Sequence, residues 1–206
     1  DALRRRWETP GDPIRDKEQR KYIGELQTVL EAYRIIGREA IEAWNPDGHA
    51  LHDLSTNRWT IEAKATSSPN GSVRISNIDQ LRYDEDSLLA LSVTRLSADP
   101  EGITLPEYAD SVLEEIARRS GEDMGLLRVT LMTLGINDAV RHLFRKKWDI
   151  GEIRFFEITE DSPIFPEGAR ELIPPEVRGI RYSLVAEGFE HAPLSDIFSE
   201  NGITSS

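Results

Sequence analysis

The sequence predicts an α/β protein in which helices flank a central sheet, and three observations carry that prediction. From about Asp16 to about Ala43, apolar residues recur at helical spacing, which indicates one long helix with a core-facing stripe. The run from Leu88 to Leu96 is rich enough in Leu and Val for a strand buried at the centre of a sheet. Beyond Pro106 the apolar spacing becomes helical again. A buried strand between helical runs is typical of a layered α/β domain.

Shorter patterns fill the rest of the first half. Residues 59–66 alternate apolar and polar side chains, and residues 51–56 can pair with them as the partner strand of a hairpin. We then expect a loop over 67–72, a third strand around 73–76 and a short helix around 78–82.

In the second half we expect helices over 107–119, 122–134 and 137–147, the last with Asn137 as its N-cap, and strands over 153–159 and 180–186. The tail from residue 193 is weakly patterned and is expected to fray. We therefore divide the chain into a linker or N-terminal remnant at 1–14, a core at 15–98 and an extension at 99–206 that packs on the core as one compact domain. Because the first residues read as a linker that enters a helix, we expect the chain to be a fragment of a longer protein.

Composition excludes several classes of protein. With 206 residues and 38% apolar content, the chain can form a globular core. It contains no cysteine, which excludes disulfides, zinc-thiolate sites and thiol nucleophiles and fits a reducing cytoplasm. No apolar run approaches the roughly 20 residues of a membrane span, so we expect a soluble, cytoplasmic protein without a membrane partner. Nucleotide-binding and acyl-transfer motifs are also missing from the sequence.

The net charge of −12 argues against a polyanion as partner, but its distribution weakens that argument. Residues 1–83 carry 13 basic and 13 acidic residues, whereas residues 84–206 carry 12 basic and 24 acidic ones. Basic residues within 15–21 alternate with acidic ones, which is more typical of a solvated helix face than of a track that contacts DNA. The basic residues at 141–147 either contact phosphates or lie there because the C-terminus of a helix stabilises positive charge.

Candidate chemistry lies on the hairpin. Since alternate strand residues point to opposite faces, Glu62 and Lys64 share one face, and Asp53 on the partner strand lies opposite them. Mg²⁺ prefers hard oxygen ligands, so the two carboxylates would hold the ion, while Lys64 orients a water molecule and stabilises developing negative charge. The alternative is a half-exposed strand in which Glu62 and Lys64 form a solvated pair.

The stretch around this hairpin resembles the PD-(D/E)xK superfamily of restriction-endonuclease-like nucleases, and within it the bacterial PD-(D/E)XK motif proteins. The resemblance covers residues 22–83 well and rests on the segments 24–26, 44–48, 52–53, 61–66 and 73–81. It implies an αβββαβ core with a central mixed sheet flanked by helices. It also implies a Mg²⁺-dependent DNA endonuclease, with Mn²⁺ able to substitute, that acts in restriction or anti-phage defence.

The resemblance also assigns roles to residues. Asp53, Glu62 and the Ala63 backbone carbonyl would bind the metal ion, and Lys64 would position the water. Glu25 would match the acidic residue that some branches carry on the first helix near the metal. Gln80 would match a Gln of the following helix that reaches back to the site.

Asp53 competes with Asp47, because the letters Pro-Asp also occur at Pro46 and Asp47. Residues 45–48 have the composition of a tight turn, so we favour Asp53 as the ligand. His49 and His52 are interpreted as loop or strand-end histidines rather than ligands.

Two other functions remain open at this point. One is a catalytically inactive scaffold with the same fold, whose acidic half binds a protein partner; the other is a structure-specific repair or recombination nuclease. Intact Asp53, Glu62 and Lys64 favour an enzyme over a scaffold. Because cleavage of both strands of a duplex commonly needs two active sites, we expect a homodimer or a partner protein of a defence system.

Overall fold

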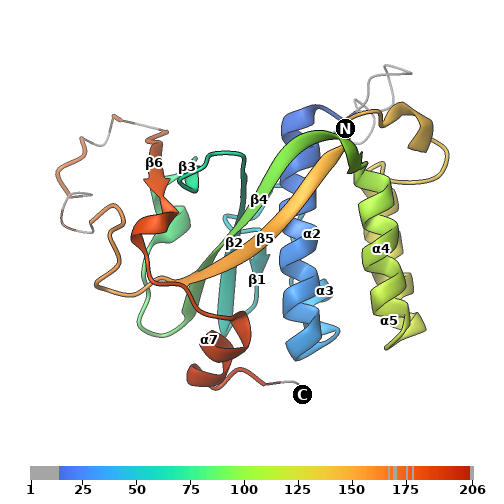
Figure 1. The fold of residues 1–206 in the computed structure, drawn as a ribbon. Coiled ribbons are helices and arrows are strands. Elements are labelled where there is room, and N and C mark those ends of the chain that lie inside the picture. Colours follow the sequence, from blue (N-terminus) through green and yellow to red (C-terminus); the bar gives the residue numbers. More distant parts are fainter. Residues whose placement is uncertain (1–13, 167, 169–170, 175, 178, 205–206) are drawn as a thin grey trace.

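A four-stranded mixed sheet forms the centre of the protein, which is described here from a computed structural model (Figure 1). The structure describes residues 14–166, 168, 171–174, 176–177 and 179–204, so residues 1–13 of the expected linker lie outside the described residues. The strand order is β1 (Leu54–Ser55), β2 (Trp59–Thr66), β4 (Leu88–Ile103) and β5 (Trp148–Glu157). The strands β2 and β4 are parallel, and the two outer pairs are antiparallel. The predicted mixed sheet is thereby confirmed.

Both faces of this sheet are buried, as the Leu-rich run in β4 predicts. Leu88 and Ala90 point into a core shared with the helices. Leu89, Leu91 and Val93 point into a second core on the opposite face. The strand β4 continues to Ile103, beyond the expected end at residue 96, because it pairs with β5 over most of its length. The strand therefore extends across residue 98, where we placed the boundary between core and extension, although its pairing with β5 is irregular after Thr94 and after Ala98.

The helix α2 (Asp16–Ile36) crosses one face of the sheet, and α4 (Leu105–Ala117) and α5 (Gly121–Thr133) lie on its outer side (Figure 1). The helix α2 comes very close to β2, since a Cβ added to Gly24 of α2 would lie 3.2 Å from the Ala65 Cβ of β2. The expected single helix to residue 43 is wrong at its end. Gly37 adopts a φ of 66°, which ends α2, and a separate short helix α3 (Glu39–Glu42) follows.

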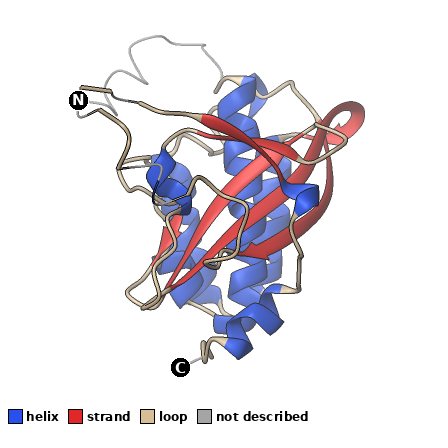
Figure 2. Ribbon diagram, turned by 90° about the vertical axis from the view of Figure 1, so that its left-hand side faces the viewer, coloured by secondary structure: helices blue, strands red, loops and turns tan. Residues whose placement is uncertain are grey.

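A separate two-stranded sheet covers the opposite face of the central sheet (Figures 1 and 2). It consists of β3 (Ser72–Ile75) and β6 (Tyr182–Val185), which pair along their whole lengths. The third strand of the expected core is therefore present but does not join the central sheet. It is followed by η1 (Ile78–Leu81), so the short helix expected around residues 78–82 is present, in the 3-10 form.

The helix expected over residues 137–147 is wrong. Asn137 caps only a turn, accepting from the Ala139 N–H at 3.0 Å, and the 3-10 turn η2 (Arg141–Leu143) is the sole helical piece there. Beyond it the chain extends into β5, because Trp148 is buried and donates its indole N–H to Gln19 of α2 at 3.3 Å. The basic residues 145–147 therefore do not lie at a helix C-terminus.

The described part of the C-terminal tail, through residue 204, is packed rather than frayed, which corrects another expectation. After the short turn η3 (Ala186–Gly188), the helix α7 (Leu194–Glu200) buries Phe198 completely. The ring of Phe198 lies 5.4 Å from that of Trp59 in β2, centroid to centroid. Within the part of the chain that the structure describes, no helix is both long and apolar enough to cross a membrane.

Replacing Gly24 with Val tests the close approach of α2 to β2. The added methyl groups must displace Ala65 or the Lys64 carbonyl, 3.6 Å from the ideal Cβ, so we expect a loss of about 1–3 kcal/mol of stability in urea unfolding. Gly125 of α5 is the matched control, since nothing lies within 4 Å of its ideal Cβ. Equal losses for Gly24→Val and Gly125→Val would show that the contact is not tight.

Candidate active site

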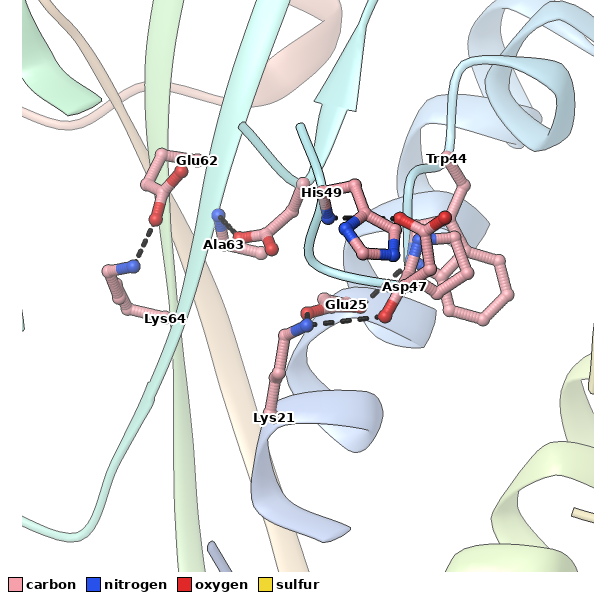
Figure 3. Close-up of polar contacts among 10 residues, drawn as sticks. Lys21, Glu25, Trp44, Asp47, His49, Glu62, Ala63 and Lys64 are labelled. Atoms are coloured by element: carbon pink, nitrogen blue, oxygen red, sulfur yellow. Dashed lines mark hydrogen bonds and ion pairs between the residues drawn. The ribbon is translucent and has the colours of Figure 1, made fainter. Parts of the chain in front are cut away.

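Glu62 and Lys64 lie two residues apart on β2 and share the face that points away from α2, as the alternation predicts. This face is covered rather than solvated: the Glu62 side chain is 1% exposed and that of Lys64 is 17% exposed. The Lys64 ammonium forms an ion pair with Glu62 Oε1 (Figure 3). The pair is therefore buried, unlike the solvated pair that was the alternative interpretation.

Asp53 lies where the edge strand β1 begins. Because Leu54 pairs with Ile61, Asp53 comes opposite Glu62 in the antiparallel register. Its Oδ2 accepts a hydrogen bond from the Ala63 N–H at 2.9 Å, and its carbonyl accepts from the Asn45 N–H at 2.7 Å. Since the N–H and C=O of a strand residue point to the same side, the Ala63 carbonyl also faces the edge where Asp53 lies.

Glu25 reaches the same region from α2 and is completely buried. Its Oε2 accepts from the Trp44 indole N–H at 2.9 Å, and its Oε1 lies 3.2 Å from the Lys21 ammonium. Trp44 is itself held in place by a β-bridge to Leu54. Figure 3 shows Glu62 and Lys64 on one side of β2 and Glu25 with Lys21 on the other.

Asp53 couples the two buried glutamates electrostatically. Burial, followed by the negative charge of Asp53, raises the pKa of Glu62 to about 8. The same two causes, in the same order, raise the pKa of Glu25 well above its usual range. Lys64 and Lys21 act in the opposite direction on Glu62 and Glu25 respectively. A positive charge placed near Asp53 would therefore stabilise both ionised glutamates.

The donor atoms suit a hard divalent cation. Glu62 Oε2 is buried and has no hydrogen-bond partner within the described residues, which is costly unless a ligand compensates. Carboxylate and carbonyl oxygens are the ligands that Mg²⁺ accepts, together with several waters. Among the described residues, no three His, Asp or Glu side chains are grouped closely enough to hold a metal ion. The Ala63 carbonyl and water would have to complete the coordination.

Gln80 lies in η1, and its side chain closes that turn. Its Oε1 accepts from the N–H and Oγ of Ser76, at 3.0 and 3.1 Å, so the amide does not reach toward the carboxylates in this conformation. The Gln80 carbonyl accepts from the ring Nε2 of His52 at 3.0 Å. Burial lowers the pKa of His52, which favours the neutral ring next to Asp53. Gln80 thus contacts the neighbour of Asp53 through its backbone.

Asp47 occupies a turn, as its surroundings in the sequence predict. It is exposed, and its Oδ1 accepts from the His49 N–H at 3.1 Å (Figure 3). Sequence reasoning missed Trp44 and Lys21, which hold Glu25. The spacing of four between Lys21 and Glu25 was a signal for the second contact, whereas no local pattern indicates the first.

A groove of about 1230 Å³ opens beside the site, on the face of β2 that carries Glu62. His52, which precedes Asp53, and Thr60, which lies on the same face of β2 as Glu62, are among its lining residues. The lining contains one arginine, Arg82, and more acidic residues than that. The acidic residues are Asp79, Asp84, Glu85 and Glu160. This wall repels phosphate groups.

Over residues 5–187, the chain matches a sequence family described as "Putative PD-(D/E)XK family member, (DUF4420)". The match includes α2, β2 and β4, and the central mixed sheet flanked by helices is consistent with the predicted restriction-endonuclease-like fold. Searches of the curated proteins and of the solved structures find no match.

The raised pKa of Glu62 predicts a pH-dependent stability. The folded protein holds a proton that the unfolded chain releases at a lower pH, so stability is lost as pH rises from about 4.5 to about 8. We expect Glu62→Gln to reduce this loss, which urea unfolding in EDTA from pH 5 to pH 9 would measure. The exposed Glu114 supplies the control variant Glu114→Gln, which should follow the wild-type profile. A Glu62→Gln profile parallel to that of the wild type would contradict the pKa shift.

Proposed function

The chain belongs to the PD-(D/E)XK family DUF4420, and from that premise we propose that it is a Mg²⁺-dependent endonuclease that hydrolyses phosphodiester bonds in DNA. The observation that carries the proposal is the position of Asp53. Its carboxylate is anchored on the Ala63 N–H, lies opposite Glu62 and raises the pKa of both buried glutamates. An arrangement of this kind is unfavourable in a protein interior unless it serves a ligand.

Asp53, Glu62 and the Ala63 carbonyl would hold Mg²⁺ or Mn²⁺, with Glu25 as a further carboxylate from the helix side. The bound ion would supply a water of lowered pKa and would neutralise charge on the phosphate. Lys64 lies on the same face as Glu62, so its ammonium can orient the attacking water and donate to the phosphate oxygen as negative charge develops. The anchoring of Asp53 and Glu25 by an N–H and an indole keeps both oriented before substrate arrives.

The biological setting that we propose, restriction or anti-phage defence, rests on the resemblance to the bacterial PD-(D/E)XK motif proteins and on no contact in the structure. A homodimer or a partner protein fits this setting, since cutting both strands of a duplex commonly requires two active sites. The scaffold alternative is disfavoured by the retention of Asp53, Glu62 and Lys64 in one region of the fold.

Substitutions at the site test catalysis. We expect Asp53→Asn and Lys64→Ala to lower cleavage of plasmid, single-stranded and branched DNA by roughly 10²-fold or more, because each removes a charge that acts on the transition state. Asp47→Asn is the matched control, since Asp47 is exposed and accepts its hydrogen bond within its own turn, from the His49 N–H. The site assignment fails if both site variants keep wild-type cleavage, or if Asp47→Asn is the variant that loses it.

Metal binding has a readout that is independent of cleavage. A ligand that binds only the folded state stabilises it, by roughly 2.7 kcal/mol at 100 times Kd. We expect Mg²⁺ and Mn²⁺ to raise the unfolding temperature of the wild type, and Glu62→Gln to abolish most of that increase because Oε2 loses its charge. Glu114→Gln should respond as the wild type does. An equal increase in the Glu62→Gln variant would contradict a metal ion at Glu62.

A further inference from the structure

Lys21 is a second lysine at the candidate active site, on the side opposite Lys64 (Figure 3). Its ammonium lies 3.2 Å from Glu25 Oε1 and donates to the Pro46 carbonyl at 3.3 Å. An ammonium has three N–H donors, and Glu25 and the Pro46 carbonyl accept two of them. The Tyr22 ring also faces the ammonium, but its centroid lies 5.6 Å from the nitrogen, too far to accept a hydrogen bond, so one donor is left for a ligand. The Lys21 side chain is 38% exposed whereas that of Glu25 is 0% exposed, so Lys21 extends from the buried carboxylate to the surface.

Helix stability accounts less well for Lys21 and Lys17 than for a basic residue placed elsewhere in α2. In a pair spaced four apart, Glu before Lys is the more favourable order, and Lys21 and Glu25 have the reverse order. Lys17, one turn earlier, lies in the first turn of α2, where the helix dipole disfavours a cation. Lys17 is exposed and forms no ion pair with another of the described residues. A role outside the helix accounts better for both positions.

Lys17, Lys21 and Glu25 follow one another at intervals of four, so they form a single row along α2. The row begins in solvent at Lys17 and ends at the buried carboxylate beside Asp53. On the other side of the site, the groove presents four acidic side chains and one arginine. A chain of phosphate groups is therefore attracted along α2 and repelled along the groove.

We propose that Lys21 binds a backbone phosphate of the nucleic-acid substrate and that Lys17 binds a further phosphate along the same row. This rests on the proposed nuclease function and adds to it the direction from which the phosphate backbone reaches the carboxylates. Lys21 keeps its contact with the Pro46 carbonyl while its remaining donor meets the phosphate.

The test is the salt dependence of DNA binding in EDTA, where cleavage is absent. Each phosphate contact contributes about 0.9 to the slope of log K against log salt for duplex DNA, and about 0.7 for single strands. To remove the effect of an unpaired Glu25, we compare Glu25→Gln with the double variant Lys21→Met/Glu25→Gln by fluorescence anisotropy on both forms of DNA. We expect the double variant to bind several-fold more weakly, with a slope reduced by about one phosphate contact.

Three further variants complete the experiment. Adding Lys17→Met should reduce the slope again, whereas Lys21→Arg should retain it, because the positive charge is kept. Arg128→Met, on the exposed surface of α5, should leave the slope unchanged. Unfolding temperatures show whether each variant is folded.

Equal slopes for Glu25→Gln and the double variant would overturn the proposal, because Lys21 would then serve only to neutralise Glu25. A wild type that fails to bind either form of DNA would also overturn it. A wild type that binds through Lys21 but never cleaves with Mg²⁺ or Mn²⁺ would support this inference while refuting the proposed nuclease activity. The two failures are therefore distinguishable.

Discussion

The hydrogen bond from the Ala63 N–H to Asp53 Oδ2 is the contact on which the arrangement of the site depends. The edge strand β1 pairs with β2 through only two residues. The Asp53 side chain therefore accepts the hydrogen bond from β2 at the position where backbone pairing with β1 has ended. On the other side of Asp53, Asn45 bonds to its carbonyl and Trp44 bridges to Leu54. The bond therefore fixes the Asp53 side chain on β2, opposite Glu62. Because residues 44 and 45 contact residues 54 and 53, it also helps to hold the Trp44 indole that donates to Glu25.

The site combines strong burial with like charges, which opposes stability. Glu25 and Glu62 lie on opposite sides of β2, and both are more than 98% buried. The negative charge of Asp53 acts on both carboxyl groups. Each is partly compensated by one lysine, yet Glu62 Oε2 still lacks a partner within the described residues. Such local conflicts are typical of functional sites, because a protein interior selected for stability alone would contain apolar or fully bonded groups here.

Local patterns predicted the elements whose own residues determine their conformation. The alternation of β2 separated Glu62 and Lys64 from Ile61 and Ala63, and the composition of β4 indicated burial on both faces. Predictions failed where distant contacts override local preference. Residues 144–148 extend because Trp148 packs on Gln19, and α7 forms because Phe198 fills the space beside Trp59. The strand β3 pairs with β6, more than 100 residues away, rather than with the central sheet.

The sequence by itself determined the mixed α/β class, the face that Glu62 and Lys64 share, and the turn that contains Asp47, because strand period and turn chemistry act over a few residues. Only the tertiary structure decided that Glu62 is buried, that Glu25 is held by Trp44 and Lys21, and that an acidic groove opens beside Thr60. The reason is physical: burial and electrostatic coupling depend on what packs against a residue, and those neighbours come from α2, the turn before β1 and the segment after β5.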